Sequence, residues 1–225
     1  MTPEECIAHV KALLPTLPAS RLLNITVHGG PARAVPDARS GPSPPAPAGS
    51  LPELHVCCRP RVPTDPAAGV NGYFEGAPRA ALPPRMFPLV GEAPPPPAFA
   101  GNVHLLADTL EGGAPQLGHL LRHELVHALD HAVHGLDLST CAGVACSEVR
   151  AAVAGHCSGS EWAPRNRDAC VLNSANNSTR RVFPTFGAQC VRLVYKECRE
   201  VGAEASPLAV VQRVLALERE REPRG

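Results

Sequence analysis

The chain has 225 residues, and its 21 basic and 21 acidic side chains give no formal net charge. That balance argues against direct nucleic-acid binding, which depends on a basic surface. The 44 % hydrophobic share suits one globular domain over residues 1–225, while 26 Pro and 19 Gly predict long irregular stretches. Charged residues interrupt every apolar run, so we expect no membrane-spanning segment and at most peripheral contact with a membrane.

The first sixty residues predict one helix and two strands. Thr2-Pro3-Glu4-Glu5 is a capping box with proline at the first helical position, and apolar residues at helical spacing follow up to Pro15. Residues 22–27 and 54–58 are apolar and partly β-branched, which favours short strands. The N-terminus lacks the basic start and apolar run of a secretory signal, and its early glutamates are unlike an ordinary transit peptide.

Two proline-rich insertions, at about residues 30–52 and 76–98, precede the region that carries the chemistry. We place the catalytic core at about residues 101–200. Near its start, Val103-His104-Leu105-Leu106 is the best strand candidate. We expect this strand to lie at the edge of a sheet beside the following helix, and to hold a substrate by backbone pairing.

Residues 115–134 predict an amphipathic helix that carries the pattern His-Glu-x-x-His. His123 and His127 are four residues apart, so both imidazoles project from one face at a spacing that can share one Zn²⁺ ion. Glu124 is placed to take a proton from a metal-activated water, which is the chemistry of a zinc hydrolase. The opposite side of the helix carries an apolar stripe: Leu117, Leu121, Leu125, Ala128 and Ala132.

Catalytic zinc usually takes a third protein ligand and leaves one position for water. One zincin class uses a third histidine, but its pattern needs glycine and histidine where this chain has Asp130 and Val133. That class is therefore excluded. We favour Glu148 on a later helix, because its neighbours Ala151 and Ala152 are small enough to let two helices approach closely.

Alternatives to this ligand set stay open on the sequence alone. The alternative interpretation of Glu148 is a surface carboxylate beside Arg150. Asp130 and His131 compete as ligands. We favour Asp130 as a hydrogen-bonding partner that orients a ligand histidine, and His131 as a solvated or structural residue.

Nine cysteines are many for a chain that stays reduced. None forms a Cys-x-x-Cys pair, so we expect disulfides in an oxidising compartment, with buried free thiols as the alternative. Adjacent Cys57 and Cys58 cannot readily pair with each other, and the odd count leaves at least one thiol without an internal partner. Six cysteines follow the histidine helix: Cys141, Cys146, Cys157, Cys170, Cys190 and Cys198.

The C-terminal part predicts two more helices. Residues 189–198 have helical spacing, with Cys190 and Cys198 on roughly one face. Ser206-Pro207 begins a last helix, with Val211 and Val214 on its apolar side. The stretch 158–185 is rich in Asn and Ser and yields no prediction of a helix or strand.

Three separated segments carry a family resemblance: residues 123–131, 145–152 and 155–157. Together they resemble the mitochondrial inner-membrane metalloprotease family that matures an ATP synthase membrane subunit and assists assembly of that complex. The clear resemblance covers about residues 117–157, with weaker echoes upstream, as at Gly72-Tyr73-Phe74, and in the downstream cysteines.

The resemblance implies a small α+β, zincin-like protease. Zn²⁺ is then held by His123, His127 and Glu148, and Glu124 acts as general base and then as proton donor. The implied substrate is an ATP synthase membrane-subunit precursor, and the implied location is the mitochondrial intermembrane space, peripheral to the inner membrane. Two rival functions are a non-catalytic assembly chaperone and a nuclear DNA-repair accessory protein, although the zero net charge disfavours direct DNA contact.

Overall fold

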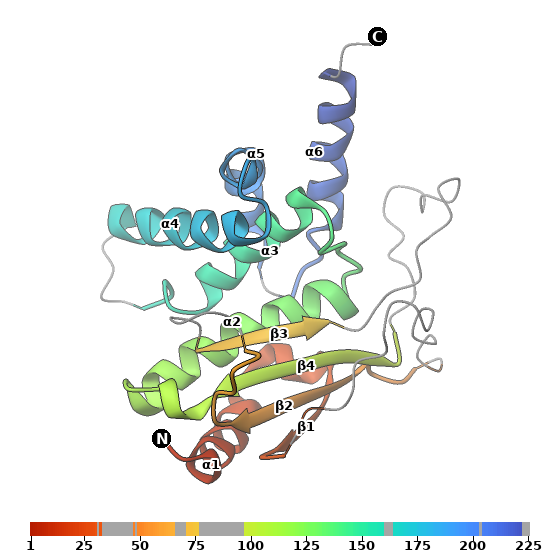
Figure 1. Cartoon of the computed structure of the whole chain (residues 1–225). Coiled ribbons are helices and arrows are strands. Elements are labelled where there is room, and N and C mark those ends of the chain that lie inside the picture. Colours follow the sequence, from red (N-terminus) through yellow and green to blue (C-terminus); the bar gives the residue numbers. More distant parts are fainter. Residues whose placement is uncertain are drawn as a thin grey trace.

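A computed structural model describes residues 1–30, 32, 47, 49–65, 71–76, 97–159, 164–202 and 204–221. Over these residues the chain forms an α+β fold with a four-stranded sheet and six α-helices (Figure 1). Most of the two proline-rich insertions lie outside the described residues. Within the described part, no helix combines the length and apolar character that crossing a membrane requires.

The sheet has the strand order β1-β2-β4-β3. In this order β1, β2 and β4 run parallel to one another. The strand β3 pairs with β4 in the antiparallel direction and lies at one edge of the sheet. Its strands are β1 (Asn24–His28), β2 (Glu53–Arg59), β3 (Gly72–Gly76) and β4 (Phe99–Leu106).

The prediction that residues 103–106 form the edge strand is therefore wrong. These residues belong to β4, an interior strand that is buried along its whole length between β2 and β3. The edge strand next to α2 is β3, which has glycine at both ends and Glu75 beside its central residue. The two glycines and Glu75 weaken its strand signal although Tyr73 and Phe74 favour strands, and pairing with β4 together with packing against α2 holds it in place.

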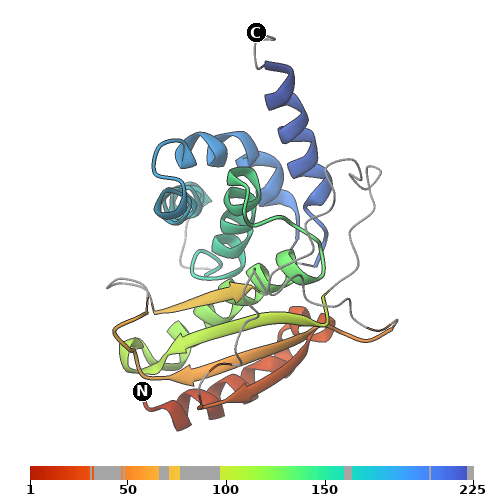
Figure 2. The same cartoon turned by 45° about the vertical axis from the view of Figure 1, so that its right-hand side comes forward.

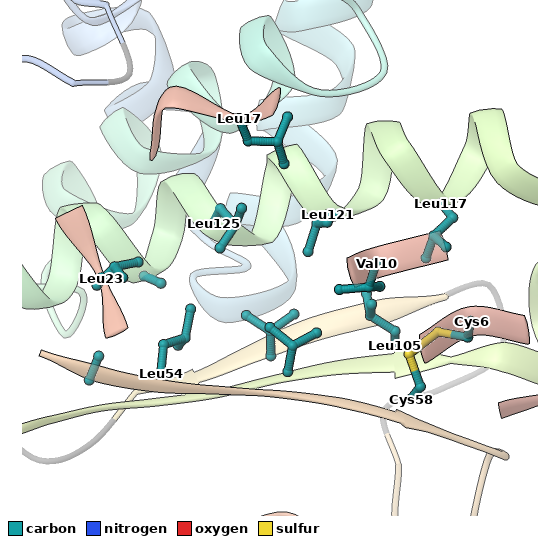
Figure 3. Packing of buried hydrophobic residues seen from close by; sticks show 14 of the residues in the cluster. Cys6, Val10, Leu17, Leu23, Leu54, Cys58, Leu105, Leu117, Leu121 and Leu125 are labelled. Carbon is teal, nitrogen blue, oxygen red and sulfur yellow. A yellow bond between two sulfur atoms is a disulfide. The ribbon is translucent and has the colours of Figure 1, made fainter. Parts of the chain in front are cut away.

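Two helices, α1 (Pro3–Leu13) and α2 (Gly113–Ala132), cover one face of the sheet (Figure 1). The predicted capping box starts α1, and all five residues of the predicted stripe on α2 are buried. Figure 3 shows Leu121 and Leu125 of α2 directed toward Leu54 and Leu105 of the sheet. Full burial of each leucine stabilises the fold by roughly 2 kcal/mol.

The remaining helices form a second layer on the other side of α2 (Figure 2). In this layer α3 packs against α2 and also contacts α4, α5 and α6, while α6 projects away from the body. Their bounds are α3 (Cys141–Ala154), α4 (Pro164–Val182), α5 (Gly187–Glu200) and α6 (Leu208–Arg221). Short 3-10 helices occupy Leu14–Thr16, Pro18–Leu22 and Ala107–Thr109.

The helix α4 was not predicted. Asn and Ser disfavour helix interiors because their side chains compete for backbone hydrogen bonds. Its buried positions are sparse, namely Val171, Ala175 and Thr179, but they recur every four residues and form one buried face. Tertiary contacts of this face with the neighbouring helices therefore outweigh the weak propensity.

Four disulfides confirm the prediction that most of the cysteines are paired. Cys6–Cys58 ties α1 to β2, and Cys141–Cys190 and Cys146–Cys198 tie α3 to α5 at two points. Cys157–Cys170 joins the chain after α3 to α4. Cys57 stays free and buried, and burial raises the pKa of its thiol to about 11, so it stays protonated near neutral pH.

A buried ion pair connects the two layers. Arg150 on α3 pairs with Asp130 near the end of α2, and neither side chain is exposed. The second guanidinium nitrogen of Arg150 donates to the carbonyl oxygens of Gly202 and Ala205, at 2.8 and 2.7 Å. One side chain thus joins α2, α3 and the segment between α5 and α6.

Replacing Arg150 should therefore destabilise the fold strongly. Arg150→Met leaves the Asp130 carboxylate buried without its counter-charge, so the free energy of unfolding should fall by about 3–5 kcal/mol. Denaturant unfolding of the oxidised protein measures this loss. The control is Arg199→Met, because the Arg199–Asp168 pair is 35 % and 50 % exposed and should contribute less than about 1 kcal/mol. Equal losses in both variants would contradict the assigned role.

Candidate metal centre

Two adjacent helices bring three possible metal ligands together. On α2, Nε2 of His123 lies 3.2 Å from Nε2 of His127. From α3, the two carboxylate oxygens of Glu148 each lie 3.6 Å from one of these nitrogens. The three side chains are only 12–15 % exposed. The structure therefore brings His123, His127 and Glu148 together as predicted, and Glu148 is not a surface carboxylate.

The electrostatics of this group suit a cation. Burial lowers the pKa of His127 to about 4, and burial together with the facing His127 lowers the pKa of His123 well below 6.5. Both imidazoles are then neutral at physiological pH, and each offers a lone pair. Oε2 of Glu148 is buried without a hydrogen-bond partner among the described residues. Two lone pairs and an unpartnered carboxylate oxygen within 4.8 Å of one another fit a metal ion well.

A second group of possible ligands lies nearby and is excluded by its chemistry. His156, Cys157 and Cys170 also place their ligand atoms within 4.8 Å of one another. Both sulfurs, however, belong to the Cys157–Cys170 disulfide. Since only a thiolate binds zinc well, this group is not a competing site.

The helix α3 orients one of the two candidate ligand histidines and approaches the other closely. Nδ1 of His127 lies 2.7 Å from the hydroxyl oxygen of Ser147, so with the Nε2 lone pair directed at the cluster, Nδ1–H donates to Ser147. Gly155 just after α3 lies so close to α2 that an added Cβ would come within 3.0 Å of the Cβ of His123. A glycine is therefore needed where the two helices approach each other.

The predicted role of Asp130 as the partner of a ligand histidine is wrong. Its carboxylate pairs with Arg150, and the partner of His127 is Ser147 instead. His131 is buried and packs beside Phe74, in keeping with a structural role. Sequence reasoning placed Ser147 on the correct helix but assigned it no role, because a serine in a helix carries no motif.

Glu124 lies between the metal group and the edge strand. Its side chain is 4 % exposed, and burial together with the neighbouring Glu148 carboxylate raises its pKa to about 8. The backbone N–H of Phe74 on β3 donates to it and partly offsets this rise. A carboxyl group with such a pKa can both take up and release a proton near neutral pH.

A cleft of three cavities that share lining residues, with volumes of about 530, 500 and 350 Å³, lies beside this group, and residues of the group line the second and third of them. Gly72 of β3 lines two of the cavities, and Ser178 and Arg181 of α4 line all three. Burial raises the pKa of Glu148 to about 7, whereas a hydrogen bond from Ser178 and the charge of Arg181 act to lower it. Neither residue was predicted, because α4 itself was missed.

No curated protein matches the chain, and no solved structure matches it. A family model does match: residues 99–201 correspond to the Peptidase M76 family. The match extends the resemblance drawn from residues 117–157 in both directions, and it supports a peptidase whose family implies a metal ion. The matched residues contain β4, the histidine helix and the helix of Glu148, so the part of the chain that holds the candidate metal ligands is similar to the Peptidase M76 family.

Proposed function

We propose that the chain is a zinc-dependent metalloendopeptidase with a zincin-like site. The observation that carries this proposal is the convergence of His123, His127 and Glu148 beside the buried carboxyl group of Glu124. Two imidazoles and one carboxylate form a ligand set that catalytic zinc uses in peptidases. A zinc ion held there would supply Lewis acidity, which polarises a carbonyl group and makes water a better nucleophile.

Residues of the chain transfer the proton and orient the side chains of the site. Glu124 takes a proton from the water that attacks the peptide carbonyl carbon, and then delivers it to the departing amine. The N–H of Phe74 holds the Glu124 carboxylate at the edge of β3. Ser147 fixes the ring of His127 through Nδ1, which keeps Nε2 directed at the metal.

The edge strand β3 is the proposed binding strand for the substrate. It pairs with β4 on one side, and its residues Gly72, Tyr73 and Phe74 line the cleft that contains His127 and Glu148. An extended peptide can add to such an edge through main-chain hydrogen bonds, which suits a protease because the peptide backbone is common to all substrates.

The proposed substrate is the leader segment of an ATP synthase membrane-subunit precursor, in the mitochondrial intermembrane space beside the inner membrane. This part rests on the family resemblance. The four disulfides support it, because they suit an oxidising compartment. Cell fractionation tests the location, and a purely nuclear pool would contradict it.

Removing the carboxylate ligand should weaken zinc binding. We expect one zinc per wild-type chain, and at least a hundredfold loss of affinity in Glu148→Ala, because a lost ligand costs more than a lost supporting hydrogen bond. Titration of the oxidised, chelator-treated protein with Zn²⁺ measures the affinity. Glu197→Ala, which changes an exposed carboxylate on α5, is the control and should bind zinc normally. Unchanged affinity in Glu148→Ala would remove Glu148 from the ligand set.

Removing the hydrogen-bond acceptor of His127 should also weaken zinc binding, but by less than removing Glu148. Ser147→Ala deletes the acceptor of the Nδ1–H bond, so zinc affinity should fall roughly tenfold to a hundredfold. The control, Ser139→Ala, alters an exposed serine outside the cleft. If the two variants bind zinc equally well, the hydrogen bond of Ser147 does not tune the site.

Glu124→Gln separates catalysis from scaffolding. Cleavage of a mixed peptide library should fall by about a hundredfold or more, because the proton acceptor is lost while all three ligands remain. Zinc content, measured on the purified protein, should stay at the wild-type level.

The same variant distinguishes a protease from an assembly chaperone. In cells, Glu124→Gln should leave the precursor uncleaved. If it supports both precursor maturation and assembly fully, the chain acts as a scaffold and the proposed protease function fails.

A further inference from the structure

The cleft has an unusual charge distribution. Among the described residues that line its three cavities, the formally charged side chains are Glu124, Glu148 and Arg181. The other lining side chains are amides, hydroxyls, imidazoles and apolar groups. In the proposed enzyme both carboxylates are engaged at the metal centre, so Arg181 supplies the one remaining charge of the described cleft wall.

The wall that contains Arg181 is one face of α4. Its cavity-lining residues recur at intervals of three or four residues and so share one side of the helix: Asn173, Asn177 and Arg181, with Ser174 and Ser178 beside them. The opposite, buried side of α4 carries Val171 and Ala175. The apolar side anchors the helix, and the polar side faces the cleft with hydrogen-bonding groups and a single cation.

Arg181 has no carboxylate of its own. Among the described residues it makes no ion pair within 4.0 Å, unlike Arg59, Arg150 and Arg199, each of which pairs with an aspartate. Its charge reaches the metal group, because it acts to lower the pKa of Glu148. The guanidinium is therefore close to the place where a peptide is cut, yet open to a partner from outside the chain.

We propose that Arg181, assisted by the hydroxyl of Ser178, is a specificity subsite for an acidic side chain of the substrate close to the cleaved bond. A guanidinium group binds a carboxylate through two parallel hydrogen bonds, and the neutral polar groups around it offer no competing charge. A basic substrate residue at the same position would be repelled. This inference rests on the proposed protease function, because it concerns the choice of cleavage site.

The test is a comparison of cleavage preferences. The zinc-loaded wild type, Arg181→Glu and Arg180→Glu are each incubated with a peptide library made from a digested proteome, and mass spectrometry locates the cut bonds. Arg180→Glu is the matched control, since it makes the same charge change one residue away, at an exposed side chain that lines none of the three cavities.

The expected wild-type result is enrichment of Asp and Glu at one fixed position near the cut. Arg181→Glu should lose that preference and favour Lys and Arg there, while Arg180→Glu should keep it. For a pair of peptides that differ only by Glu or Gln at this position, the kcat/KM ratio should fall about fivefold or more in Arg181→Glu, the order expected for one partly exposed charge pair.

Several outcomes would overturn the inference. They are a wild type without acidic preference, a preference that survives Arg181→Glu, and an equal loss of cleavage for every sequence, which would show a general rather than a specific role. Absence of any cleavage by the wild type is a different result, because it would refute the proposed protease function itself.

Discussion

The close approach of α3 to α2 is the constraint on which the candidate site depends. The histidines lie on one helix and the carboxylate on the other, so three ligands meet only if the two helices nearly touch. Gly155 permits this contact, since even a single added methyl group would press on His123. The buried Arg150–Asp130 pair fixes the same interface at its other end. An ion pair that is costly to bury thus sets the register of two helices whose alignment the chemistry requires.

Disulfides reinforce the C-terminal helical layer, in which α4 contributes few residues to the hydrophobic core. The helix α4 is rich in Asn and Ser, and buried apolar side chains are few along it. Covalent links instead join α3 to α5 at two points and connect the end of α3 to α4. Such links limit the freedom of the unfolded chain, so a polar helix can stay in place. The polar side of α4 is then free to line the cleft rather than to support a core.

The two walls of the cleft differ in kind. On one side, β3 offers main-chain groups, which recognise any extended peptide. On the other side, α4 offers side chains, among them Ser178 and Arg181, which can distinguish one peptide sequence from another. The metal group and Glu124 lie between these walls. In the proposed enzyme, binding and selection of the substrate are thus assigned to different elements of secondary structure.

The sequence by itself determined the elements whose signal is local. Helical spacing and capping predicted α1, α2, α5 and α6, and the spacing of His123 and His127 predicted a shared metal, while α3 was inferred from the need for a third ligand. Cysteine count and spacing predicted disulfides, although not their pairing. The tertiary structure alone decided that β3 is the edge strand, that Ser147 rather than Asp130 supports His127, and that α4 lines the cleft. These features depend on contacts between residues far apart in the chain, and burial and pairing there outweigh local propensity.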